Sequence, residues 1–149
     1  MPPKDVFLAE ALAEATKGRD EGGIPIGSVL VRDGVIIGRG HNRRVQDGSV
    51  IHHAEMNCLE NAGRLAPSVY REATLYTTLS PCSMCAGAAA LFGVKKVVIG
   101  ENKTFEMSED FLRSKGIEVE VADDAECYKI LQDFIKDHPE VWDEDIGGH

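Results

Sequence analysis

The spacing of apolar residues along the chain predicts alternating helices and strands. Leu8, Ala11, Leu12 and Ala15 recur at helical spacing with charged residues between them, which indicates an amphipathic first helix. Glycines at positions 18, 22 and 23 are expected to end this helix.

Two β-rich runs follow, at residues 26–31 and 35–38, and Asp33-Gly34 between them is a strong signal for a tight hairpin. A loop with few apolar residues, 42–49, separates this hairpin from the next helix. Beyond the loop, the pattern predicts helices at 53–62, 82–92, 108–115 and around 128–135, and strands at 74–79, 97–99 and 117–121.

This order of elements predicts an α/β protein, namely a three-layer α/β/α sandwich around a five-stranded mixed sheet. After the hairpin the strands are joined through helices, so most of the sheet is expected to be parallel. At 149 residues, without a repeat or a linker, the chain is expected to form one domain over residues 1–149.

The composition limits which class of protein the chain can belong to and which kinds of partner it can bind. With 43% hydrophobic and 28% charged residues, the chain has the balance of a soluble globular protein, and it has no apolar run long enough for a membrane helix. A net charge of −9 argues against nucleic-acid binding and favours a small uncharged substrate. The first residues do not resemble a signal peptide, so a cytoplasmic location is expected, with the nucleus as an alternative.

Two short motifs carry the chemistry. His53-Ala54-Glu55 and Pro81-Cys82-Ser83-Met84-Cys85 offer one imidazole and two thiols, three ligands for one zinc ion per chain. Three ligands leave one corner of a tetrahedron open for water, and Glu55 is close enough in sequence to carry its protons. We therefore expect hydrolytic chemistry, in which a metal-bound hydroxide attacks an amidine-like ring carbon and ammonia leaves.

The metal ligands are expected at helix starts. A helix N-terminus favours thiolate over thiol, and Pro81 suits the entrance to such a helix. Residues two apart do not share a helix side, so His53 and Glu55 can both reach the site only if their helix points at it end-on. Both ligand helices should therefore aim their N-termini at one metal.

A structural zinc site is the non-enzymatic alternative. It would need a fourth ligand, for which His41, His52 or Cys58 could be proposed, but none has the usual spacing. The H-x-E spacing selects His53 over His52. Cys58 and Cys127 are interpreted as small buried apolar residues.

With the zinc motif in place, the chain resembles the cytidine-deaminase-fold superfamily and, more narrowly, the fungal-type cytosine deaminases. The resemblance covers nearly the whole length. The segments that carry it are Glu21–Gly27, Gly38–Asn42, Leu59–Leu65, Thr74–Cys82 and Trp142–Gly147.

This resemblance implies polar contacts to a pyrimidine base. Asn42 would bond the exocyclic carbonyl, assisted by the backbone N–H of Ala54, and Asp145 would accept the ring N1–H. A nucleoside has a sugar at N1, so a carboxylate there would select the free base. Ser80 belongs to the same expected substrate-binding set.

The resemblance also implies an apolar enclosure for the base. Phe105 and Trp142 would cover the ring, and Ile26 would pack near it. A C-terminal tail at about residues 139–149 would close over the active site. The family further implies a homodimer.

The lead functional hypothesis is zinc-dependent hydrolysis of cytosine to uracil and ammonia, as in pyrimidine salvage. One alternative is a deaminase of another amino-heterocycle, such as isocytosine, guanine or a nucleoside. Another is a tRNA adenosine deaminase, which Ala54 and Cys85-Ala86-Gly87 resemble but which the acidic charge opposes.

Overall fold

A computed structural model describes residues 5–148, so the outermost ends of the predicted domain, 1–4 and 149, lie outside the described part. Five strands and eight helices are assigned within it. In chain order they are α1 Val6–Asp20, β1 Gly27–Arg32, β2 Val35–His41, α2 Arg44–Asp47, α3 Ala54–Ala62, α4 Pro67–Arg71, β3 Thr74–Leu79, α5 Ser83–Phe92, β4 Lys96–Glu101, α6 Glu109–Ser114, β5 Glu118–Val121, α7 Ala125–Asp137 and α8 Pro139–Asp145.

The five strands form one mixed sheet in the order β2-β1-β3-β4-β5. Two of the four pairings are antiparallel, β1 with β2 and β1 with β3, so the expectation of a mostly parallel sheet is wrong. The physical reason is the path of the chain through α3. This helix carries the chain across β1, so β3 runs in the same direction as β2 but lies on the other side of β1.

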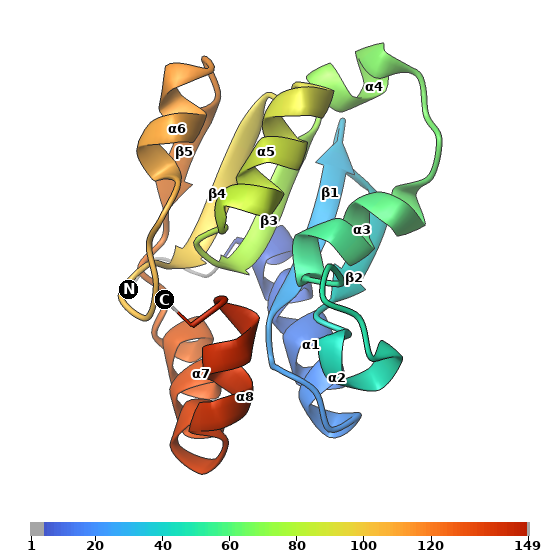
Figure 1. Ribbon diagram of the computed structural model, residues 1–149. Helices are drawn as coiled ribbons and strands as arrows, with labels where there is room; N and C mark the ends of the chain where they lie inside the picture. Colours follow the sequence, from blue (N-terminus) through green and yellow to red (C-terminus); the bar gives the residue numbers. More distant parts are fainter. Residues whose placement is uncertain (1–4, 149) are drawn as a thin grey trace.

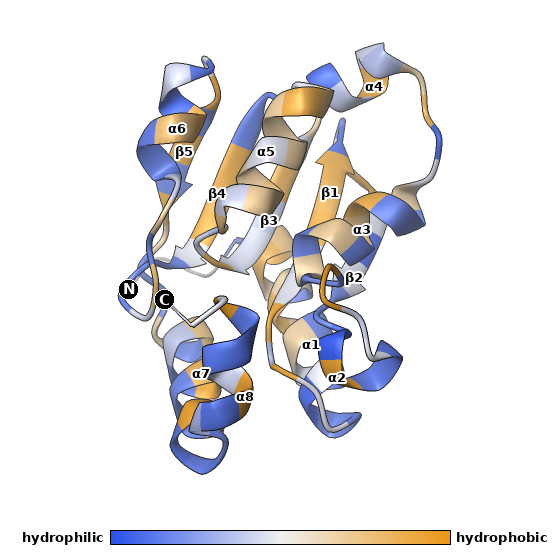
Figure 2. Ribbon diagram, viewed as in Figure 1, coloured by the Kyte–Doolittle hydropathy of each residue, from blue (hydrophilic) through white to orange (hydrophobic). Residues whose placement is uncertain are grey.

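Helices cover both faces of the sheet, which confirms the three-layer sandwich (Figure 1). α3, α5 and α6 pack on one face, and α1 and α7 on the other. Cys58 and Cys127 are buried, as the sequence predicted. They lie in different layers: Cys58 packs in the cluster under α3 and α5, and Cys127 in the cluster under α1. Figure 2 shows β1 and β4 as mainly apolar, and the outer surface of α8 as hydrophilic.

The predicted hairpin is confirmed by its backbone. Asp33 and Gly34 both have positive φ, 51° and 74°, as a two-residue turn with the twist of the flanking strands requires. The strand after this turn runs longer than predicted and ends at His41 instead of Gly38. Its last residues lie at one end of the sheet, beside the N-terminus of α3.

The first helix does not end at Gly18. It continues to Asp20, and Gly18 is buried where a Cβ would lie 3.1 Å from Cδ2 of His41. Glycine allows the His41 ring to pack closely there, and its cost within a helix is only about 1 kcal/mol, which tertiary contacts outweigh.

Three short helices were not predicted. α2 lies in the expected loop, α4 follows α3, and α8 forms where the sequence suggested only a tail. Elements of four to seven residues span fewer than two helical turns, so apolar periodicity cannot show them. Within residues 5–148, no helix has both the length and the apolar character that crossing a bilayer requires.

Candidate active site

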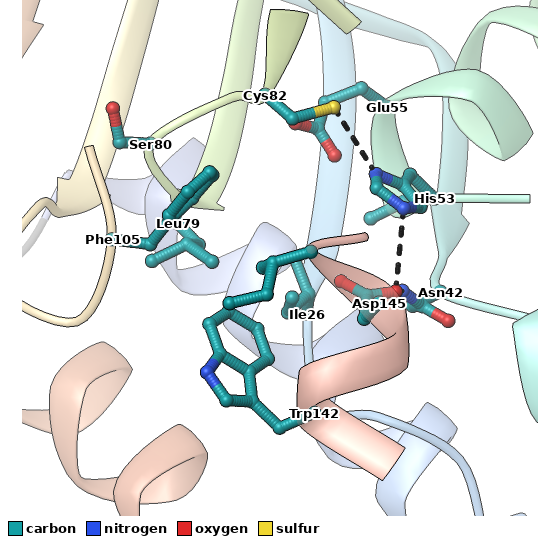
Figure 3. A pocket seen from close by; sticks show the side chains of 12 residues that line it. Ile26, Asn42, His53, Glu55, Leu79, Ser80, Cys82, Phe105, Trp142 and Asp145 are labelled. Carbon is teal, nitrogen blue, oxygen red and sulfur yellow. Dashed lines mark hydrogen bonds and ion pairs between the residues drawn. The ribbon is translucent and has the colours of Figure 1, made fainter. Parts of the chain in front are cut away.

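The two zinc motifs meet at the ends of two helices, as the sequence predicted. His53 is the N-cap residue of α3, and Cys82 is the N-cap residue of α5. Both helices lie on the same face of the sheet, and their N-termini point into one pocket (Figure 3). Unpaired N–H groups at both helix starts make this end of the pocket electropositive, which favours thiolates.

The three predicted ligands come together with the spacing that a metal needs. Nδ1 of His53 lies 3.5 Å from Sγ of Cys82 and 3.7 Å from Sγ of Cys85, and the three donor atoms lie within 4.8 Å of one another. Zinc bonds of about 2.0–2.3 Å place tetrahedral ligands about 3.5–3.8 Å apart. The donor chemistry and these distances therefore fit zinc.

No fourth ligand joins this set among the described residues. His41 lies between two glutamates, and Nδ1 of His52 lies 2.9 Å from Asp47. Cys58 is buried in the core, where desolvation raises the pKa of its thiol. The candidates for a closed structural site thus have other partners.

The electrostatic surroundings of the ligand cluster favour binding of a cation. The hydrogen bond from Cys85 and the neighbouring His53 outweigh burial and lower the pKa of the Cys82 thiol to about 4. The pKa of the Cys85 thiol is raised, because this thiol shares a hydrogen bond with the Cys82 thiolate and is buried beside it. Removal from water raises the pKa of the Glu55 carboxyl to about 7. Glu55 is only 4% exposed and lines the pocket next to the ligands.

Asp145 reaches the site from α8 and contacts a ligand. Its Oδ1 lies 3.4 Å from Nε2 of His53, the ring nitrogen that faces away from the thiols, and accepts a 2.8 Å hydrogen bond from Nδ2 of Asn42 (Figure 3). A carboxylate on the second ring nitrogen of a ligating histidine fixes the tautomer that leaves Nδ1 free for the metal.

The orientation of the Asn42 amide follows from its neighbours. Its Oδ1 accepts a 3.0 Å hydrogen bond from the backbone N–H of Arg44, while its Nδ2 donates to Asp145. An amide NH₂ carries two hydrogens, so one donor of the fully buried Asn42 remains for a ligand.

The pocket is covered by an apolar lid. The rings of Phe105 and Trp142 meet edge to face, with centroids 6.3 Å apart and planes at 84°. The lining residues are Ile26, Asn42, His53, Ala54, Glu55, Leu79, Ser80, Cys82, Phe105, Trp142, Asp145 and Ile146.

The structure places ten of the eleven predicted site residues in this lining, and the eleventh, Cys85, is buried within the metal-ligand cluster. Sequence reasoning missed two lining residues, Leu79 and Ile146. Both adjoin predicted residues: Leu79 precedes Ser80 at the end of β3, and Ile146 follows Asp145. Adjacency at the end of a strand or helix is the signal that could have found them.

A three-donor metal site beside a buried acid, at the helix ends of an α/β/α sandwich, defines a zinc-dependent deaminase. Comparison with known families agrees with this class. Residues 1–101 match the model of the cytidine and deoxycytidylate deaminase zinc-binding region. The chain belongs to this deaminase family.

Individual relatives act on different substrates. The chain is 51% identical to a cytosine deaminase of Candida albicans over 141 residues, 94% of each chain. It is 46% identical over 101 residues to a tRNA-specific adenosine deaminase of Bacillus subtilis, which covers 67% of this chain and 63% of that protein.

Solved structures share the fold. A structure from a study of tRNA:A34 deaminases superposes with a TM-score of 0.71 at 30% identity and covers 84% of this chain and 98% of its own. A guanine deaminase from Nitrosomonas europaea, at 22% identity, has a TM-score of 0.70 over 90% of this chain and 85% of its own. At that identity the likeness shows the fold alone.

Proposed function

We propose that this protein is a zinc-dependent cytosine deaminase that hydrolyses the free base to uracil and ammonia. The observation that carries the proposal is the pairing of Asn42 with Asp145 in the pocket, beside the His53, Cys82 and Cys85 cluster. The 51% identity to a cytosine deaminase over 94% of the chain supports the same substrate.

His53, Cys82 and Cys85 would hold the metal. Zinc, when bound, supplies a water whose pKa is lowered toward about 7. Glu55 carries protons: it is buried beside the ligand cluster, and its carboxyl delivers one proton to the ring nitrogen and another to the departing amine. Its raised pKa suits both accepting and releasing a proton near neutral pH.

Asn42 and Asp145 recognise the polar edge of the base by hydrogen bonds. The remaining Nδ2 hydrogen of Asn42 donates to the ring carbonyl oxygen, and the first-turn N–H of Ala54 assists. The Asp145 carboxylate accepts the N1–H that a free base has and a nucleoside lacks. Ser80 is also in the lining, but its hydroxyl donates a 2.6 Å hydrogen bond to Oε2 of Glu109 and points away from the pocket, so the predicted contact of this side chain with the base is not part of the proposal.

Apolar side chains hold the ring between them. Phe105 and Trp142 cover it, and Ile26 packs beneath. Because Trp142 and Asp145 both lie on α8, this helix and the residues after it act as the lid of the site. We therefore expect the segment from about residue 139 onward to move when the substrate enters.

A substrate panel tests the proposal. Zinc-loaded protein is incubated with cytosine, cytidine, isocytosine, guanine and a tRNA anticodon hairpin, and ammonia release is measured. Cytosine is expected to react fastest and cytidine at least about a hundredfold more slowly. Equal turnover of cytidine would contradict the role of Asp145, and turnover of the hairpin without cytosine would favour tRNA editing.

A pair of variants on α8 sharpens that test. Asp145→Asn is expected to lower kcat/KM for cytosine about a hundredfold, because it removes a charged hydrogen-bond acceptor. Asp143→Asn changes an exposed carboxylate on the same helix and should leave kcat/KM unchanged. If the two substitutions changed kcat/KM equally, the proposed role of Asp145 in substrate binding would be contradicted.

We also propose that the protein is a cytoplasmic homodimer. Support comes from exposed apolar side chains around a groove between α3, α4 and α5, among them Ile51, Leu65, Leu91 and Phe92. A surface of this kind on a water-soluble enzyme favours association with a second copy. Sedimentation should give a dimer, and Leu91→Glu should shift it toward monomer; a wild-type monomer would refute the proposal.

A further inference from the structure

His41 is buried beside the end of the pocket where Asn42 would bind the base, but His41 itself lines no part of that pocket. It is the last residue of β2, and Asn42 follows it. β2 is an edge strand of the sheet, so its outer side has no neighbouring strand to hold it. Pairing with β1 therefore holds this strand end on one side only, and its other side depends on contacts with other elements.

The His41 ring is held on both nitrogens by α1 and the residue that follows it. Nδ1 lies 3.0 Å from Oε1 of Glu14, and Nε2 lies 2.8 Å from Oε1 of Glu21. Two carboxylates can both accept hydrogen bonds only if both ring nitrogens carry hydrogen. With both glutamates ionised, the ring is an imidazolium between two anions, and the hydrogen bond to Glu14 is the largest cause of its raised pKa. Nη1 of Arg43 also lies 3.2 Å from Nε2 of His41, where it shares Oε1 of Glu21 with the ring.

Two arginines complete the charge balance of this cluster. Nη1 of Arg39 lies 3.3 Å from Oε2 of Glu14, and Nη1 of Arg43 lies 3.0 Å from Oε1 of Glu21. Each glutamate therefore shares its charge between His41 and one guanidinium. Loss of the His41 charge would leave the nearly buried Glu14 without its closest cation.

Hydrogen bonds also hold the backbone around His41, and one of them comes from α3 on the other face of the sheet. The N–H of His41 donates a 3.1 Å hydrogen bond to Oδ1 of Asn57 on α3, and the N–H of Asn42 donates to the carbonyl of Ile26 at 2.9 Å. On the α1 side, the ring packs against Gly18, where an added Cβ would lie only 3.1 Å from Cδ2 of the ring. Helices on both faces of the sheet thus converge on this one strand end.

We propose that His41, clamped between Glu14 and Glu21, is a positioning residue that holds Asn42 in register for substrate binding. The inference rests on the proposed function, because Asn42 is there the donor to the base. His41 touches neither substrate nor metal ligand and acts through the strand end it anchors.

Kinetics of His41→Gln test the proposal. Because the Asn42 hydrogen bond to the base is made before and during reaction, KM for cytosine should rise about tenfold with kcat changed less than about twofold. Glu118→Gln on β5, which removes an exposed ion pair with Lys96, is the control and should match wild type. Glu21→Gln removes the more exposed of the two carboxylates that hold His41, and it should also raise KM, by a smaller factor. This variant tests the proposal if His41→Gln does not fold.

A double-mutant cycle separates positioning from general destabilisation. In an Asn42→Ala background, the added His41→Gln substitution should change KM by less than about twofold, because the group it positions is absent. Additive effects of the two substitutions would overturn the proposal. So would a loss of kcat in His41→Gln at unchanged KM.

A spectroscopic readout is independent of turnover. In wild-type protein at pH 7, both His41 ring nitrogens should show protonated ¹⁵N shifts, and the Asn42 side-chain amide should shift in His41→Gln but not in Glu118→Gln. A neutral His41 ring or an unmoved Asn42 amide would refute the positioning role. If wild type released no ammonia from cytosine, the proposed function would fail while these spectra still decided the role of His41.

Discussion

At the scale of single residues, chemistry depends on where a polar group is buried. Glu55 and Glu60 lie on the same helix, α3, five positions apart, yet Glu55 is almost fully buried beside the ligand cluster and Glu60 is exposed. Their side chains therefore have different roles despite identical chemistry, and the two positions form a matched pair for experiment.

Glu55→Gln should lower kcat by about 10³–10⁴-fold while zinc stays bound, because the proton carrier is removed and the ligands are kept. Steady-state kinetics and metal content by mass spectrometry measure the two effects. Glu60→Gln is the control and should keep full activity. A Glu55→Gln protein that lost its metal would show that Glu55 is a ligand.

The His41 cluster makes stability depend on pH in a defined direction. The folded-state pKa of His41 is raised above its ordinary value of about 6.5, so its contribution is complete below pH 6.5 and is lost as pH rises through the folded pKa. The pKa values of Glu14 and Glu21 are lowered below 4.5, chiefly by the hydrogen bond to His41. Their contribution is present above pH 4.5 and is lost as pH falls through the folded values.

The Tm difference between wild type and His41→Gln should therefore be largest between about pH 4.5 and 6.5 and should narrow as pH rises above that window. Thermal unfolding followed by circular dichroism across pH 4–10 measures it. A difference that grew with increasing pH would contradict an imidazolium at His41.

At the scale of elements, glycines show where helices and strands approach most closely. A Cβ at Gly27, the first residue of β1, would collide with the backbone of α1 at Ala11 and Ala15. Gly87 lies inside α5 and has open space at the same position. The same substitution should therefore have opposite effects at these two sites.

Gly27→Ala should lower the free energy of unfolding by about 3 kcal/mol, because the backbone of α1 must shift. Gly87→Ala should raise it by about 0.5–1 kcal/mol through reduced backbone freedom in the unfolded chain. Denaturant titration of the zinc-loaded proteins measures both. A tolerated Gly27→Ala would mean that α1 and β1 pack less tightly than described.

At the scale of the whole molecule, one metal would join the N-termini of two neighbouring helices, α3 and α5, that share a hydrophobic cluster. His53 begins α3 and Cys82 begins α5, with 28 residues and two further elements between them. Zinc binds the folded arrangement of these groups in preference to the unfolded chain, so it should stabilise the fold as well as serve the reaction.

Removal of zinc by a chelator should lower Tm by about 5–10 °C, as expected for a ligand present at about a hundred times its Kd. Added zinc should restore both Tm and activity. The Tm of Cys85→Ser, which lacks one donor, should respond little to the chelator. An unchanged Tm after confirmed metal loss would show that the site is not coupled to folding.

Much of the site could be predicted because its information is local. Three kinds of signal each act within a few residues: the H-x-E and P-C-x-x-C spacings, the Asp33-Gly34 turn, and the apolar periodicities of the longer elements. The sequence by itself therefore determined the zinc donors, the buried acid and the sandwich of helices on a sheet. The substrate contacts were expected from the resemblance, and their roles stay proposals. Local patterns also indicated that both ligand helices start at the site, which the structure confirms.

Only the tertiary structure decided which distant groups meet. It placed β3 beside β1, added Leu79 and Ile146 to the pocket, and set His41 between Glu14 and Glu21. Such contacts join residues far apart in the chain, and many pairings satisfy the same local pattern. Packing of the whole core selects one of them, because burial and charge pairing are complete only when all the layers assemble together.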